Sequence, residues 1–136
     1  ANYCRANLSN QFLPNIIKCG SFKMGERRFL FTQMERLFPF SASTMSEVGE
    51  VLEEMTWAIE NNLSQDRFLK NCLKYGILEV EELVIHLGEK GFQLLWSTIK
   101  DLNKIAKSSD YVLDLHSGNF MLGSNGHIVI SDPFTA

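Results

Sequence analysis

Three polar side chains in the last quarter of the sequence are of the types that bind metal ions and phosphates. Asp114 follows an apolar pair at 112–113, Asn119 comes five residues later, and Asp132 follows an apolar run at 128–130. Carboxylate and amide oxygens are ligands that Mg²⁺ takes in proteins, usually together with phosphate oxygens. We therefore expect Asn119 and Asp132 to hold a magnesium ion, and Asp114 to orient a hydroxyl group or a water molecule.

The elements around these residues must bring them together. Two apolar runs, 120–122 and 128–130, flank a turn at 123–126 that contains Asn and Gly, the residues that supply positive φ angles in tight hairpins. Such a hairpin would make Asp114, Asn119 and Asp132 converge. A second interpretation is also open, because Asp and Asn often stabilise turns by bonding to nearby backbone groups.

The motif DLHSGN at 114–119, followed by a strand, a glycine-containing turn and a strand that ends in Asp132, resembles the catalytic half of the protein-kinase-like superfamily. It is most similar to the aminoglycoside and choline phosphotransferase branch, whose loop reads like D-L-H-x-G-N. The resemblance implies that Asp114 is the catalytic-loop acid, Asn119 a metal ligand, and Asp132 the metal-binding residue of the motif usually read D-F-G. It also implies Mg²⁺ and ATP as cofactors.

A second hairpin is expected near the start of the chain. Strand-forming residues at 16–22 and 28–32 flank a turn at 23–26. This segment resembles the last two strands of a kinase N-lobe as they run into the hinge. The resemblance implies that Met34, Glu35 and Leu37 lie along an adenine ring. A plain antiparallel hairpin explains the same residues equally well, and both interpretations stay open.

Apolar residues at helical spacing predict about four helices between the two hairpins, the last over 92–107. Capping residues and glycines mark the expected helix starts and stops: Thr44 with Glu47, Ser64, Gly76 and Gly88. The first helix carries Glu50, Glu53 and Glu54, which form either a surface for a partner or simply a solvated face.

Composition narrows the class of protein. The net charge of −3 argues against a general nucleic-acid binder, and the apolar fraction of 45% is ordinary for a globular protein. Cys4, Cys19 and Cys72 are odd in number and lack metal-ligand spacing, as is usual for reduced thiols. With no signal-peptide pattern and no long apolar run, we expect a cytoplasmic protein without a membrane segment.

These observations predict one α+β domain over 1–136, a minimal kinase-like fold with an N-terminal hairpin, about four helices and a C-terminal hairpin. Its three parts are a hairpin with a hinge-like segment at 14–37, a helical part at 44–107 and the catalytic-loop-like hairpin at 111–134. The sequence has no G-x-G-x-x-G loop and no lysine in the context of a phosphate-binding lysine, so we expect a truncated, degenerate member of the superfamily.

Small kinase-like proteins of this kind resemble bacteriophage products that act by occupying a host protein. The leading hypothesis is therefore a protein that binds and modulates a host macromolecule, most simply a protein, in the bacterial cytoplasm, rather than an enzyme. One alternative is a minimal Mg²⁺-dependent phosphotransferase or nucleotide-binding enzyme that uses Asp114, Asn119 and Asp132. Another is a generic α+β interaction domain.

Overall fold

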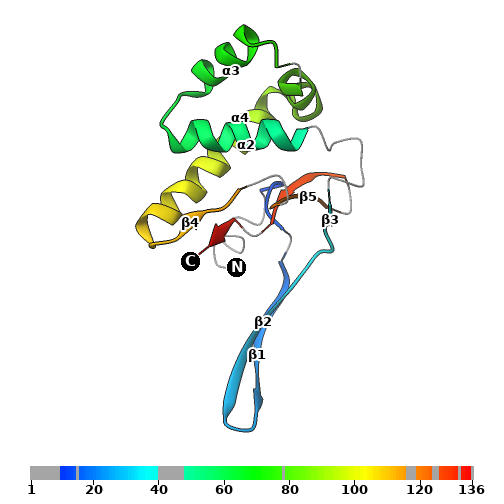
Figure 1. Ribbon diagram of the computed structural model, residues 1–136. Helices are drawn as coiled ribbons and strands as arrows, with labels where there is room; N and C mark the ends of the chain where they lie inside the picture. Colours follow the sequence, from blue (N-terminus) through cyan, green and yellow to red (C-terminus); the bar gives the residue numbers. More distant parts are fainter. Residues whose placement is uncertain are drawn as a thin grey trace.

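The protein has the expected α+β fold, with helices on one side and short antiparallel strands on the other (Figure 1). A computed structural model describes residues 10–14, 16–39, 48–77, 79–115, 119–123, 126–131 and 133–135. Within them lie three helices, namely α2 (Val48–Glu60), α3 (Gln65–Lys74) and α4 (Glu79–Ser108). In the same residues, no helix is both long and apolar enough to cross a bilayer.

The helix ends follow the residues that favour them. The side chain of Ser64 caps α3 by accepting a hydrogen bond of 3.2 Å from the N–H of Arg67, and Gly76 follows α3 with a positive φ of 67°. Element α4 consists of two helices separated at Gly88, whose φ of 75° and ψ of 169° are non-helical, as the glycine stop in the sequence predicts. The expected capping pair Thr44 and Glu47 lies outside the described residues.

The hydrophobic core lies between α2 and the second half of α4, which cross each other in Figure 1. Leu52 and Met55 of α2 and Leu95 and Ile99 of α4 are fully buried. These residues recur every three or four positions, so each helix turns one apolar stripe toward the other. Helix α3 joins the core through Phe68, whose ring centroid lies 5.4 Å from that of Trp96.

Below the helices, the C-terminal half forms two small antiparallel sheets. One has the strand order β3-β5-β6, with β3 at Phe38–Pro39, β5 at Phe120–Leu122 and β6 at Ile128–Ile130. The other pairs β4 (Val112–Leu113) with β7 (Phe134–Thr135). The hairpin expected from the two apolar runs is therefore present.

A turn near the start of the chain covers the outer edge of β6. Phe12 is fully buried in the core, and its carbonyl accepts a hydrogen bond of 2.8 Å from the N–H of Ile130. Asn10 secures the turn because its side chain donates to Thr98 of α4 (2.8 Å) and accepts from the N–H of Phe12 (3.0 Å). An unpaired strand edge is thereby protected.

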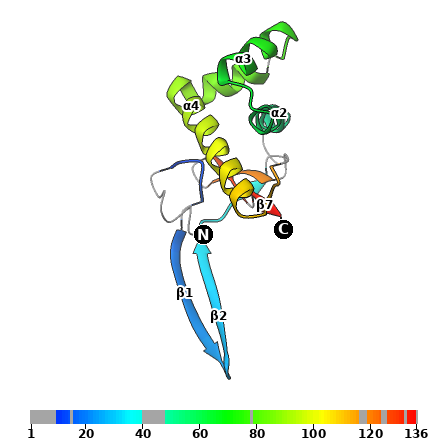
Figure 2. The same cartoon turned by 90° about the vertical axis from the view of Figure 1, so that its left-hand side faces the viewer.

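The N-terminal hairpin projects from this body rather than packing on it (Figure 2). It consists of β1 (Ile16–Met24) and β2 (Arg27–Met34), both longer than the sequence predicts. Gly25 takes a positive φ of 64° in the connecting turn, a conformation that glycine adopts without strain.

Replacing Phe12 by alanine should lower the free energy of unfolding by about 3–5 kcal/mol, because a fully buried ring leaves a cavity. Leu73→Ala is the control, since Leu73 is 68% exposed on α3. Urea denaturation measures both values. A loss for Phe12→Ala no larger than for Leu73→Ala would show that the N-terminal turn is not part of the core.

Candidate functional site at Asp114 and Asn119

Asp114 lies immediately after β4, where the chain leaves the small sheet. Its N–H donates a hydrogen bond of 2.7 Å to the carbonyl of Pro133, the residue before β7. Leu113 and Phe134 are paired in the adjoining β4–β7 ladder. The ladder and this bond fix the backbone of Asp114 relative to the end of the C-terminal hairpin.

Asn119 is attached to both sides of this loop. Its side-chain nitrogen Nδ2 donates to the carbonyl of Asp114, and its own carbonyl accepts from the N–H (2.8 Å) and Oγ (3.1 Å) of Ser131. Because Nδ2 is the donor, the carboxamide is oriented and Oδ1 is the atom that a cation can take. Asn119 directly precedes β5 and Ser131 directly follows β6. Because Phe120 is paired with Ile130, Asn119 and Ser131 lie beside each other at the open end of the hairpin.

The structure thus brings Asp114 and Asn119 together. Asp132 and residues 116–118 lie outside the described residues, although both sequence neighbours of Asp132, namely Ser131 and Pro133, bond to the two other members of the trio. Among the described residues, no cluster of at least three His, Cys, Asp and Glu side chains is placed to hold a metal ion. The metal role of Asn119 and Asp132 therefore stays a prediction.

The hinge-like segment at 34–37 contacts the C-terminal hairpin at Gly123. Met34 ends β2 and is 40% exposed, whereas Glu35 and Leu37 are half-buried. The carboxylate of Glu35 lies against Gly123, where an added Cβ atom would be 3.1 Å from Oε2. A nucleotide contact of these residues stays a prediction, but the segment does connect the N-terminal hairpin to the sheet beside Asp114.

The acidic face of α2 is only partly open to solvent. Glu50 and Glu54 are exposed, whereas Glu53 is half-buried. Burial raises the pKa of the Cys72 thiol on α3, and the negative charge of Glu54 raises it further. A thiol with a raised pKa forms little thiolate, and Cys72 packs in the hydrophobic core.

Two features of the structure are absent from the sequence-based predictions. The first is an exposed aromatic face on the N-terminal hairpin, which the alternation of Phe29 and Phe31 opposite Phe22 signals. The second is a pocket lined by Lys100, Lys104 and Lys107, for which the spacing i, i+4, i+7 is the signal. Neither feature includes Asp114 or Asn119.

Comparisons with protein-family models, with curated proteins and with solved structures find no match to this chain. The functional proposals below therefore rest on the residues and contacts of the chain itself.

The Asn119 side chain should stabilise the loop measurably. We expect Asn119→Ala to lower the free energy of unfolding by about 1–3 kcal/mol, because the half-buried carbonyl of Asp114 loses its partner. Asn61→Ala is a matched control, since Asn61 donates the same kind of bond to the carbonyl of Trp57 (2.8 Å) but is exposed. Equal losses in urea denaturation would mean that the Asn119 bond has no special structural role.

Proposed function

We propose that this chain is a kinase-like protein that acts by binding another protein, and that the projecting hairpin is its contact surface. The kinase-like part of the proposal rests on the resemblance of the 114–132 motif and is supported by the bonds that link Asp114, Asn119 and Pro133. The binding part rests on one observation, the exposed aromatic face of β1 and β2.

Three phenylalanines share that face. Phe22 stacks on its cross-strand partner Phe29 with ring centroids 5.3 Å apart, and Phe31 lies 6.3 Å from Phe22 and covers Gly20. The three rings are 36–47% exposed, and Met24 on the same face is 66% exposed. A two-stranded hairpin is marginally stable alone, and a contiguous apolar patch on a soluble protein marks an interaction site.

The charge of the hairpin indicates the chemistry of the partner. Between 16 and 34 it carries four basic residues against one acidic residue, whereas the whole chain has a net charge of −3. The basic residues are Lys18, Lys23, Arg27 and Arg28, and the acidic one is Glu26. A partner protein with an apolar patch inside an acidic rim complements this surface. In line with the bacteriophage resemblance, we place that partner in a host bacterium.

Polar substitution of the aromatic face should weaken binding and leave the core intact. The test variant is Phe22→Thr with Phe29→Thr, which keeps residues that favour strands. The control is Leu30→Thr, because Leu30 is 85% exposed on the opposite face of the hairpin. Capture from bacterial lysate, followed by titration with the purified partner, should show at least about tenfold weaker binding for the double variant, or 1.4 kcal/mol.

A photo-crosslinking side chain identifies the contact directly. Placed at Met24, which is on the aromatic face, it should form a crosslink to the same partner, whereas at Ile85, which is 82% exposed on α4, it should not. Equal binding by the double variant and the control, or crosslinks only from Ile85, would contradict the proposal that the hairpin is the contact surface.

A second candidate function is Mg²⁺-dependent phosphoryl transfer or nucleotide binding at Asp114, Asn119 and Asp132. The observation in its favour is that the Asn119 carboxamide is oriented by its bond to the Asp114 carbonyl, while the backbone carbonyl of Asn119 accepts from Ser131, the neighbour of Asp132. In this reading Asp114 orients the attacking hydroxyl group, while Asn119 and Asp132 hold the cation that neutralises the phosphates.

This candidate predicts stabilisation by Mg-ATP. At a concentration of one hundred times Kd, the ligand should add about 2.7 kcal/mol to the free energy of unfolding, read as a raised melting temperature. Asp132→Asn should remove the shift and Glu50→Gln, a charge change on exposed α2, should keep it. No shift with millimolar Mg-ATP, or an unchanged shift in Asp132→Asn, would exclude this site for the nucleotide.

A further inference from the structure

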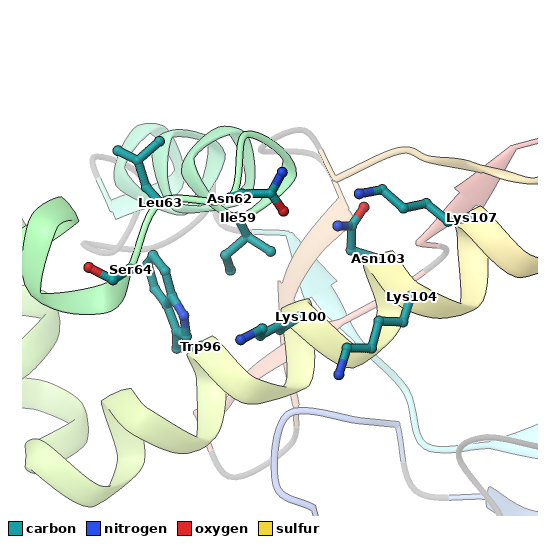
Figure 3. Close-up of a pocket in the computed structure, with 9 residues that line it drawn as sticks. All are labelled: Ile59, Asn62, Leu63, Ser64, Trp96, Lys100, Asn103, Lys104 and Lys107. Atoms are coloured by element: carbon teal, nitrogen blue, oxygen red, sulfur yellow. The ribbon is translucent and has the colours of Figure 1, made fainter.

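A pocket of about 430 Å³ lies between the end of α2 and the second half of α4, on the helical side of the molecule (Figure 3). Its apolar lining consists of Ile59, Leu63 and Trp96. Its polar lining consists of Asn62, Ser64, Asn103, Lys100, Lys104 and Lys107, so it has three cations and no carboxylate. The volume is within the range of small-molecule sites.

Asn103 is the residue that indicates a ligand. It is only 8% exposed, and its side chain faces the pocket in Figure 3. Every fully buried side-chain nitrogen and oxygen among the described residues has a hydrogen-bond partner. None of the side-chain hydrogen bonds between described residues involves the Asn103 carboxamide, so its polar atoms open into the pocket. Its two N–H donors are therefore available to a molecule in the pocket.

The helix dipole does not explain the lysine row. The dipole stabilises positive charges only in the last turn of a helix. This accounts for Lys107, whereas Lys100 lies two turns before the end of α4 at Ser108. In Figure 3, Lys100 extends toward Trp96 and Lys107 toward Asn103, whereas Lys104 turns away from Asn103. Lys100 and Lys107 lie about 10 Å apart along the helix, so their two cations flank the pocket.

We propose that this pocket binds a small organic phosphate, with its apolar or ring part against Leu63 and Trp96 and its phosphate between the lysines and Asn103. A phosphate monoester carries about two negative charges and three strong acceptor oxygens, which match ammonium groups and carboxamide N–H donors. The pocket is lined by none of the Asp114, Asn119 or hairpin residues, so the proposal is independent of the proposed function.

The test uses the intrinsic fluorescence of Trp96. The chain has two tryptophans, and Trp57 is 58% exposed outside the pocket, so Trp57→Phe leaves Trp96 as the only reporter. Adenosine monophosphate is titrated in EDTA at low ionic strength, which keeps any Mg²⁺-dependent site inactive. We expect a saturable change in emission with an apparent Kd below about 1 mM, weakening as salt is added, and no saturable change with adenosine.

Substitutions then locate the site. Lys100→Gln with Lys107→Gln should weaken binding by about tenfold or more. Lys70→Gln with Lys90→Gln is the matched control, with the same loss of charge at exposed helical positions outside the pocket. Asn103→Asp should also weaken binding, because it removes the donors and adds a negative charge. The exposed lysine variants keep the test decisive even where Asn103→Asp does not fold.

Four outcomes would overturn the proposal. They are the absence of saturable binding of adenosine monophosphate, equal affinities in the two double variants, equal binding of adenosine, and tighter binding of a polyglutamate peptide than of adenosine monophosphate. The last outcome would identify the lysine row as a surface for acidic proteins.

Discussion

The bond from the Asp114 N–H to the Pro133 carbonyl closes the loop on which the C-terminal half of the protein depends. Backbone groups that are buried away from water need partners, and the groups next to this bond are paired in turn. Asn119 donates to the Asp114 carbonyl, and Ser131 donates to the carbonyl of Asn119. Beyond Ser131, Ile130 bonds to Phe12, which ties the N-terminal turn to the same unit.

The stability of the N-terminal hairpin depends on a different set of interactions. Its strands are long and paired with each other from Lys18 to the turn, but its side chains are exposed or half-buried. Ring stacking between Phe22 and Phe29 offsets only part of the entropy cost of ordering an isolated hairpin. The protein therefore combines a closed body, where motif residues are held in place, with an arm whose apolar face is exposed to solvent.

Much of this architecture could be predicted from the sequence because its signals are local. Ser64 and Gly76 mark the ends of α3, and the apolar runs around Gly123 and Gly126 mark the second hairpin. Gly88 marks the break between the two helical parts of α4 in the same way, with a positive φ of 75°. The exposure of the phenylalanines in the N-terminal hairpin could not be predicted from the sequence, because the burial of a side chain depends on segments that are distant in the chain.

The candidate site and the pocket were likewise predictable only where the signal is local. The pairing of Asp114 with Asn119 follows from a short motif, whereas the pocket joins Asn62 at the end of α2 to Asn103 in α4, across tertiary contacts that no local pattern encodes. The lysine spacing was visible, but a lysine row on a helix is usually only a solvated face. What distinguishes this row is the largely buried side chain of Asn103 beside it.

Residue-resolved amide hydrogen exchange by NMR tests most directly the central claim of a closed body with a separate arm. The account predicts that the amides of Asp114, Ile130 and Ser131 exchange as slowly as those of the buried stretch of α4, through global unfolding. The amides of β1 and β2 should exchange much faster, through local opening of the hairpin. Hairpin amides as protected as that of Asp114, or an Asp114 amide that exchanges as fast as they do, would contradict the account.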